Sequence, residues 1–213
     1  MKKHLSLILL ATLSTSAYAT EFFIGGGTGY QSMKGEINDS EFGIFDDKAQ
    51  GAAFHLRGGV YLDQNHRFTA TINHMVDSSF HRNRLNQEPE NLSSSIDLAQ
   101  TEYLVSYDYV HAMTADLSVF GGATAGWVNN RVEMSIYDRD SGDSASHKAS
   151  QTDVTYGLQV GAQYKILDNL SADLQYRHMF ESYSDTINWD NGDTTKLSIP
   201  YNNQISLSFD YRF

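Results

Sequence analysis

Cysteine is absent from this chain of 213 residues, and proline occurs only twice. The absence of cysteine excludes a disulfide framework, a thiolate metal ligand and a thiol nucleophile. Basic residues are also few, because 15 Lys and Arg stand against 26 Asp and Glu and give a net charge of −11. This acidic balance argues against nucleic acid as a partner. Beyond residue 19, no apolar run is long enough for a membrane helix.

Aromatic residues and glycine are plentiful, with 13 Tyr, 11 Phe and 16 Gly, and the good helix formers make no long periodic runs. This composition favours an all-β protein.

The first 19 residues have the features of a secretory signal peptide. Lys2 and Lys3 give a positive start, and an apolar core at 5–13 is too short to span a bilayer. The small residues around Tyr18 fit a cleavage site between Ala19 and Thr20. The sequence therefore predicts a signal peptide at 1–19 and one exported domain at 20–213.

The exported part alternates between apolar and less apolar residues with a period of two. In the clearest segment, Tyr156 and Leu158 face one way, while Gly157 and Gln159 face the other. Each segment has about ten residues or more, the length that a tilted membrane strand needs. The eight predicted strands are 22–30, 52–62, 68–76, 99–109, 117–127, 152–166, 170–181 and 203–213.

The connections between these segments alternate strictly between short and long. The short ones are 63–65, 111–115 and 167–169, and the long, polar ones are 34–50, 81–92, 137–151 and 184–200. An up-and-down barrel with short turns at one end and long loops at the other produces this alternation. The predicted fold is an eight-stranded antiparallel up-and-down transmembrane β-barrel.

The alternation alone does not say which face points outward, since a soluble barrel would turn its apolar face inward around a ligand. Three features favour the membrane barrel, and one of them is that the sequence stops on Phe213 at the end of a predicted strand. Charges of both signs on the less apolar face can pair inside a lumen, either as a plug or as an ion path. Aromatic residues near the strand ends form two rings, as at membrane interfaces. The predicted lumen network is His55, Arg57, Glu102, Lys165, Asp173, Arg177, Glu181, Asp210 and Arg212. The predicted rings are Phe22, Phe68, Tyr109, Tyr164, Tyr211 and Phe213 at one rim, and Tyr30, Phe54, Phe80, Tyr156, Phe180 and Tyr201 at the other.

Three stretches besides the signal carry a resemblance: FFIGGG at 22–27, VFGGATAGW at 119–127 and the ending SFDYRF at 208–213. The chain resembles the small outer-membrane β-barrel family of Gram-negative bacteria, with the OmpA transmembrane domain, OmpX and the Ail/opacity-type surface proteins. The resemblance implies a location in the cell outer membrane. It also implies that Tyr211 and Phe213 form the signal read by the outer-membrane assembly machinery. The chain departs from the OmpA type by ending at the barrel, without a peptidoglycan-binding domain.

Two segments of the long connections are candidate contact sites. His81, Arg82 and Arg84 can hold lipopolysaccharide phosphates, because a guanidinium matches phosphate oxygens, or they form an ordinary polar loop. An apolar group at 42–45 either offers a contact surface or folds back onto the rim.

His74 and His178 fall on the apolar face, where a lipid A deacylase of the barrel type would place its histidine. Positions 76 and 180 hold valine and phenylalanine, so no serine stands at strand spacing beside either histidine. The acidic stretch 138–143 lacks the glutamate that a calcium loop needs at its twelfth position, which is Ala149. We therefore expect no catalytic residues, no cofactor and no metal.

The sequence predicts a structural and surface-interaction protein. Its four long outer connections would serve envelope integrity, adhesion or lipopolysaccharide contact, because rigid scaffolds often carry function on loops. The expected partners are outer membrane lipids, lipopolysaccharide, the assembly machinery and a host or neighbouring cell surface. The alternatives are a small porin-like passive channel and, less favoured, a lipid A-modifying enzyme.

Overall fold

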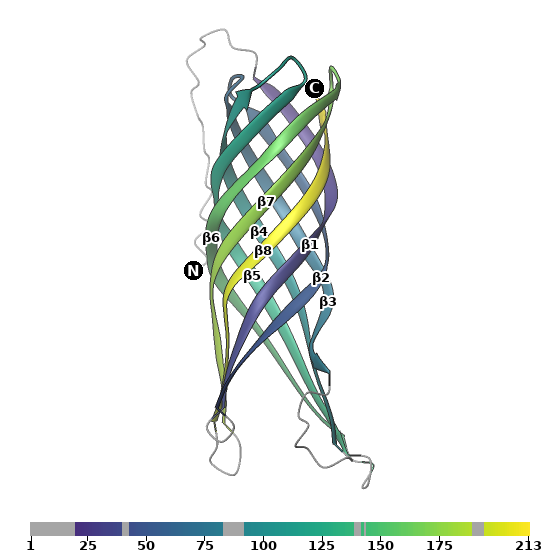
Figure 1. Ribbon diagram of the computed structural model, residues 1–213, viewed down its shortest axis with the longest axis vertical. Helices are drawn as coiled ribbons and strands as arrows, with labels where there is room; N and C mark the ends of the chain where they lie inside the picture. The colour runs from purple at the N-terminus through teal and green to yellow at the C-terminus, as the bar shows by residue number, and fades with distance from the viewer. Residues whose placement is uncertain (1–19, 40–42, 83–91, 139–141, 143, 189–193) are drawn as a thin grey trace, which may run out of the picture.

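The computed structural model is a closed barrel of eight antiparallel strands in sequence order, as predicted (Figure 1). It describes residues 20–39, 43–82, 92–138, 142, 144–188 and 194–213. The predicted signal peptide at 1–19 lies outside these residues. Within the described ranges, no helix has the length and apolar character needed to cross a membrane. The strands are β1 (Glu21–Asp39), β2 (Gly43–Tyr61), β3 (His66–Arg82), β4 (Leu92–Ala112), β5 (Leu117–Asp138), β6 (Ser144–Leu167), β7 (Leu170–Asn188) and β8 (Thr194–Arg212).

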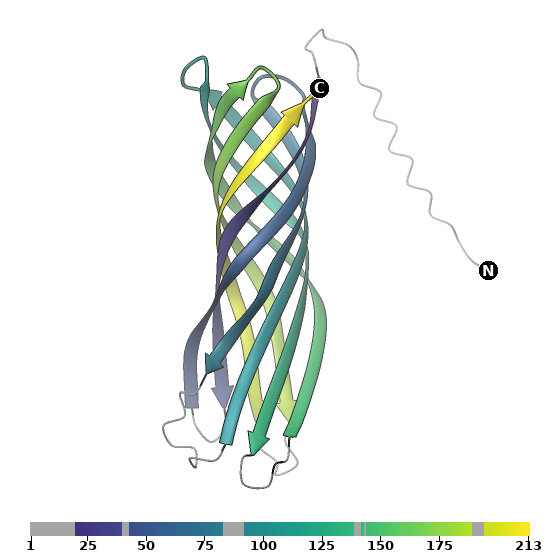
Figure 2. The same ribbon diagram turned by 90° about the vertical axis from the view of Figure 1, so that its right-hand side faces the viewer.

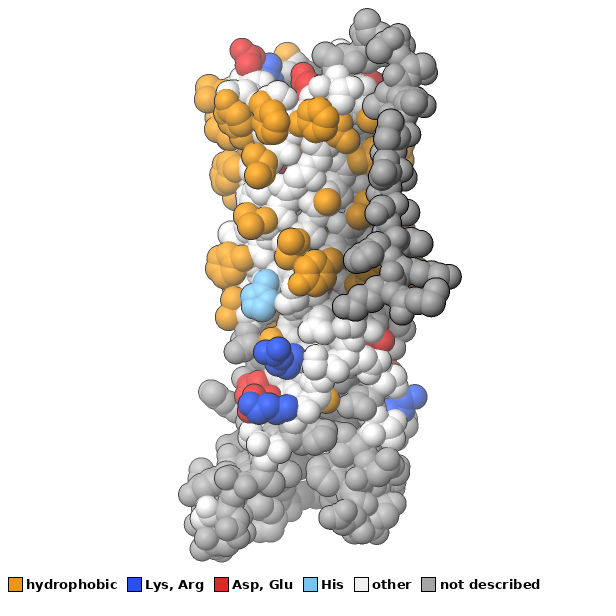
Figure 3. Space-filling view, turned by 180° about the vertical axis from the view of Figure 1, so that it is seen from behind, with side chains coloured by type: hydrophobic (Ala, Val, Ile, Leu, Met, Phe, Trp, Pro, Cys, Tyr) orange, Lys and Arg blue, Asp and Glu red, His pale blue; other side chains and the backbone are white. Residues whose placement is uncertain are grey.

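The apolar face of the barrel points outward and the polar face points inward. Leu56 is 72 % exposed and Ile24 63 %, whereas Asp173 is fully buried. Hydrophobic side chains accordingly cover the outside of the part nearer the short turns, and charged groups lie beyond that band (Figure 3). The described members of both predicted aromatic rings lie on this outer surface, and the side chain of Phe80 is outside the described part. This arrangement is that of a membrane barrel with aromatic girdles.

The strands are tilted relative to the barrel axis. Starting at Lys34 of β1 and stepping through paired residues on β8, β7, β6, β5, β4, β3 and β2 returns to β1 at Ile24, ten residues away. A stagger of this size requires the strands to tilt by roughly 35–45° from the axis. Residues that pair across neighbouring strands therefore lie at different heights along the barrel axis.

The strands are much longer than the sequence predicted, with 17 residues in β3 and 24 in β6. The predicted long connections are mostly continued strand, since β1 and β2 pair as far as Asp39 and Gly43. The prediction failed because the outward face becomes polar beyond the membrane band, for example at Ser32, Lys34 and Gln50. Pairing continues there, but the hydrophobic alternation that reveals a strand does not.

At the end away from the C-terminus, which we call the distal end, the barrel divides into two sheets (Figures 1 and 2). Pairing of β2 with β3 stops at Ala53 and Met75, and pairing of β6 with β7 stops at Tyr156 and Phe180. The other strand pairs continue beyond these levels. Distal sheet A therefore contains β7, β8, β1 and β2, and distal sheet B contains β3, β4, β5 and β6.

Irregular pairing marks both points of division. The register of β3 with β4 shifts between Met75 and Ser78, and the register of β7 with β8 shifts between Phe180 and Tyr183. Such bulges bend a strand and increase its twist. They turn β3 away from β2 and β7 away from β6 at the level where the sheets part.

Candidate functional site

A network of ion pairs fills the middle of the lumen. Arg67 Nε and Nη2 donate to Asp108 at 3.0 and 2.9 Å, and Arg67 Nη1 donates to Asp173 at 2.6 Å. Arg57 donates two bonds to Asp210, at 2.8 and 2.7 Å, and approaches Asp173 at 2.9 Å. All five side chains are buried. Asp173 thus joins two guanidinium groups into one connected structure.

Polar side chains extend this network toward the distal end. Arg177 donates to Glu102 at 2.8 Å and also to Gln204. Asn73 donates to the same Glu102 oxygen at 2.7 Å. His55 and Ser208 lie within hydrogen-bond distance, at 2.7 Å. The buried charges are therefore paired and hydrogen-bonded, as a buried ionic group requires.

Inward-facing glycines allow these partners to meet, because each lies between two residues from strands that are not neighbours. Gly25 of β1 pairs with Arg57 on one side and Asp210 on the other. In the same way, Gly122 of β5 lies between Asp108 and Gln159, which are 2.6 Å apart. A Cβ at Gly25 would lie 2.0 Å from Asp210 Oδ1, so only glycine leaves room for the contact.

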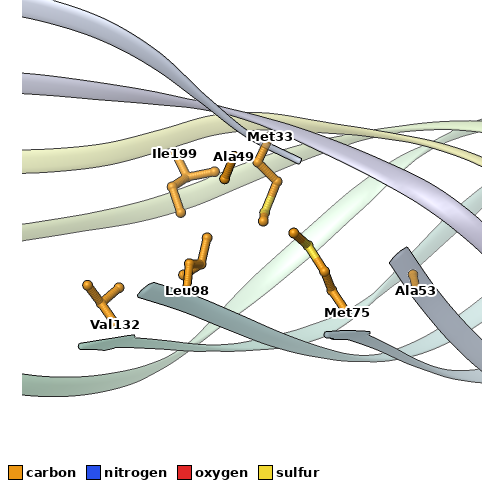
Figure 4. Close-up of a cluster of buried hydrophobic side chains, with 7 residues drawn as sticks. All are labelled: Met33, Ala49, Ala53, Met75, Leu98, Val132 and Ile199. Carbon is orange, nitrogen blue, oxygen red and sulfur yellow. The ribbon is translucent and has the colours of Figure 1, made fainter. Parts of the chain in front are cut away.

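Apolar layers close the lumen above and below the network. The distal layer joins residues from both distal sheets, and Figure 4 shows Met33, Ala49 and Ile199 facing Met75, Leu98 and Val132. The opposite layer is Phe23, Tyr61, Val110 and Phe120. One cavity between them, lined by Arg57, Arg67 and Arg177 among other residues, has about 10 Å³, which is room for one water.

At the short-turn end the lumen opens into a pocket of about 260 Å³. Arg212 lines this pocket, stacks over the Tyr61 ring at 4.4 Å and donates to Gln163 at 2.7 Å. Lys165, predicted inside the lumen, is instead exposed at this rim and pairs with Asp168 at 2.7 Å. Lys165 therefore lines the mouth of the lumen but is not part of the buried network, because β6 ends just beyond it, at Leu167, where the lumen opens to water. The hydrogen bond from Lys165 lowers the pKa of the Asp168 carboxyl.

The remaining members of the predicted network divide into two groups. Glu181 has a side chain outside the described part. Six members are buried in the lumen: His55, Arg57, Glu102, Asp173, Arg177 and Asp210. Arg67 and Asp108 also belong to the network and were not predicted, although Arg67 is its most extensively paired cation. Extending the alternation of 68–76 back by one residue would have placed Arg67 on the inward face.

The two histidines of the outer surface each contact a cross-strand neighbour. His74 Nδ1 lies 2.9 Å from Thr101 Oγ1, and His178 Nδ1 lies 2.6 Å from Asn203 Oδ1. Strand spacing along one chain segment did not reveal Thr101, because the pairing of β3 with β4 brings it there.

The C-terminal residues lie at the short-turn rim. Tyr211 and Phe213 are exposed on the outer surface, and the Phe213 ring stacks on Phe22 with centroids 6.5 Å apart. Their role as an assembly signal stays a prediction. The predicted lipopolysaccharide contacts are not described: Arg84 lies outside the described residues, and His81 and Arg82 end β3 without described side chains. The apolar group at 42–45 likewise has no described side chains.

Comparisons with known proteins agree with this architecture. The family model described as "Outer membrane protein beta-barrel domain" matches residues 5–213. The structure of OprG from Pseudomonas aeruginosa is similar, with a TM-score of 0.55, 15% identity, and coverage of 92% of this chain and 97% of OprG. The structure of the outer membrane protease OmpT from Escherichia coli is also similar, with a TM-score of 0.53 and 12% identity. The match covers 95% of this chain and 99% of OmpT.

Neisserial surface protein A gives a TM-score of 0.50 and 16% identity, covering 90% of this chain and 97% of that protein. No curated protein sequence matches the chain. At these identities, the similar structures support the fold alone.

Proposed function

Since the chain belongs to the outer membrane protein β-barrel domain family, and is thus an outer membrane β-barrel protein, we propose that it is a structural and surface-interaction protein. In such barrels the short turns face the periplasm and the longer connections face outward. The distal end would then be extracellular. It would contact lipopolysaccharide or another cell surface and contribute to envelope integrity.

The filled lumen is the observation that carries this proposal. Ion pairs and two apolar layers occupy the interior, and the cavity between them has room for one water. The distal sheets, by contrast, extend far beyond the aromatic girdle. On β5 the strand continues from Trp127 to Asp138, which is roughly 35 Å along the strand at about 3.3 Å per residue. These sheets therefore offer a partner an extended surface beyond the membrane band.

Truncation of the distal hairpins tests the proposal without altering the barrel. The cuts are placed at paired residues, and each hairpin is closed by Asn-Gly, a sequence that favours tight hairpin turns. Segments 36–46, 80–96, 134–147 and 186–196 would be removed one at a time, leaving flanking pairs such as Gly35–Asp47 and Glu133–Lys148. We expect at least one truncation to reduce binding to lipopolysaccharide vesicles, adhesion to host cells or resistance of cells to detergent.

Assembly of each truncated barrel is checked by its heat-modifiable migration in gels. If all four assemble and keep every wild-type property, the distal end is not where the function lies.

A small passive channel is the second candidate, and the packed lumen argues against it. We expect the wild-type protein to give no large, stable conductance steps in planar bilayers, because Arg67 and the distal apolar layer block the path. A barrel preparation that shows such steps reproducibly would favour the channel instead.

We propose that the protein carries no catalytic machinery. The contact of His74 with the Thr101 hydroxyl resembles a base and a nucleophile. In the described part of the chain no carboxylate bonds to His74, whereas in a Ser-His-Asp triad the acid orients the histidine. Mass spectrometry of lipid A incubated with the protein would reveal any loss of an acyl chain.

A further inference from the structure

Two rows of polar side chains cross the outside of the barrel at the base of the distal sheets. Each row takes one residue from each of four adjacent strands, at paired positions. Row A, on distal sheet A, is His178, Asn203, Ser32 and Gln50. Row B, on distal sheet B, is His74, Thr101, Asn129 and Thr152. The two rows correspond to one another, since each begins with a histidine on the strand where the sheets part.

Because the strands are tilted, each row runs obliquely across the outside, and its histidine is the member nearest the short turns and the aromatic girdle. On β7, His178 stands between Tyr176 and Phe180 on the outward face, and on β1, Ser32 follows Tyr30. Polar groups at this depth of a bilayer are costly unless they find partners, and they are functional candidates for that reason. A lipid headgroup is the natural partner at the boundary between acyl chains and water.

Row A is held in place by its own hydrogen bonds. Asn203 Oδ1 accepts from Tyr176 Oη at 2.8 Å and from His178 Nδ1 at 2.6 Å. Because that oxygen can only accept, His178 carries a proton on Nδ1 and turns Nε2 outward from this contact. The His178 ring lies against Phe180 and Tyr201, with centroids 4.7 and 5.6 Å away.

These contacts leave polar groups available for a ligand. No hydrogen bond from Asn203 Nδ2 is found within the described ranges of the chain. On the other half of the row, Tyr30 donates to Gln50 Oε1 at 2.7 Å, and Gln50 Nε2 lies 3.5 Å from Ser32 Oγ. Row A therefore presents amide, imidazole and hydroxyl groups in a fixed arrangement.

Two lysines lie on the same two strands as Ser32 and Gln50, two residues further toward the distal end. Lys34 and Lys48 are paired residues on β1 and β2, and both side chains are on the outward face. Lys34 also bonds to Glu36 at 2.7 Å. Both lysines also have partners within the protein. A phosphate group that contacts both ammonium groups would add charge-assisted hydrogen bonds to these interactions.

We propose that row A, with Lys34 and Lys48, binds the phosphorylated sugar headgroup of an outer-leaflet glycolipid. The lysines take the phosphate, and Asn203, His178 and Gln50 bond to sugar hydroxyl and acyl-amide groups. A phospholipid would use the lysines but has no sugar for the neutral groups. The inference rests on the proposed function, because it requires the distal end to face outward.

The test measures lipid binding to the full barrel domain in detergent micelles. The probes are bisphosphorylated lipid A, dephosphorylated lipid A and phosphatidylglycerol. We expect wild type to prefer bisphosphorylated lipid A over both others. A cation near a charged lipid surface contributes about 1 kcal/mol, so K34Q/K48Q should bind it roughly 30-fold more weakly. The matched control K165Q changes a lysine at the opposite rim and should bind like wild type, as should K34R/K48R.

Asn203→Leu separates the sugar from the phosphate contribution. This variant should lose most of the preference for lipid A over phosphatidylglycerol while still binding both. Equal affinity of wild type for lipid A and phosphatidylglycerol, or unchanged binding by K34Q/K48Q, would overturn the inference.

The outcome is distinguishable from failure of the proposed function. The truncation that removes 36–46 keeps Lys34, Lys48 and all of row A. If the lysine variant binds lipid A normally while a hairpin truncation still loses adhesion, only the headgroup site is wrong. If the lysine variant loses lipid A while every truncation behaves as wild type, the site stands and the distal sheets lose their proposed role.

Discussion

Replacing Arg67 with alanine is expected to lower the free energy of unfolding of the barrel by about 3–5 kcal/mol. Arg67 is 1 % exposed and bonds to both Asp108 and Asp173. Its guanidinium also lies 4.3 Å from the centroid of the Phe120 ring. The variant would leave Asp108 with no cation and Asp173 with Arg57 alone, so that charge remains buried without compensation. Urea unfolding of the protein in phospholipid vesicles, followed by tryptophan fluorescence, measures the change.

The control variant breaks an ion pair that is exposed to water, whereas Arg67→Ala breaks ion pairs that are buried in the lumen. Lys165 and Asp168 form a solvent-exposed pair, so Lys165→Ala should leave the unfolding free energy close to that of wild type. Adding Asp108→Asn to Arg67→Ala should recover part of the loss, because the unpaired carboxylate is then gone. A loss for Arg67→Ala no greater than that for Lys165→Ala would mean that the network is not a stabilising element.

The barrel and the orientation of its faces were predictable from the sequence, because the lipid band imposes a strong period-two signal. Residues such as Leu56 and Tyr156 had to be apolar, and their inward neighbours did not. The strand lengths were not predictable, because this period-two signal ends where the lipid band ends. Beyond the band, both faces of the distal sheets contact water or each other, and residues such as Lys34 no longer differ in polarity in a strand-like way.

Six of the buried lumen residues were predictable from the alternation, but Arg67 and Asp108 were not among them, and the pairing of the charges was not predictable. Arg57 and Asp210 belong to strands separated by β1, and they meet only because Gly25 lies between them. That contact depends on the register of three strands, which the sequence does not specify when turns and bulges set it. The polar rows of the outer surface depend on register in the same way, since Ser32 and Asn203 are distant in the chain.

Adjacent glycines on β5 provide a direct test of which face points inward. Gly122→Leu is expected to prevent stable assembly, at a cost of about 3 kcal/mol or more. A Cβ at Gly122 would lie 2.0 Å from the Tyr107 carbonyl oxygen and 2.4 Å from Asp108 Oδ1. The backbone cannot move away without breaking the pairing of β4 with β5, and the bond between Gln159 and Asp108 would be lost.

Gly121→Leu makes the same substitution one residue earlier, on the outward face. The nearest atoms to a Cβ there are 3.9 Å away, and the new side chain would extend into lipid. We expect this variant to refold like wild type, with the same heat-modifiable band after refolding into detergent, while Gly122→Leu gives little or none. Equal behaviour of the two variants would show that the crowded lumen does not restrict this strand. The reverse result would mean that the inward and outward faces of β5 are exchanged, and the ion-pair network built on Asp108 would have to be abandoned.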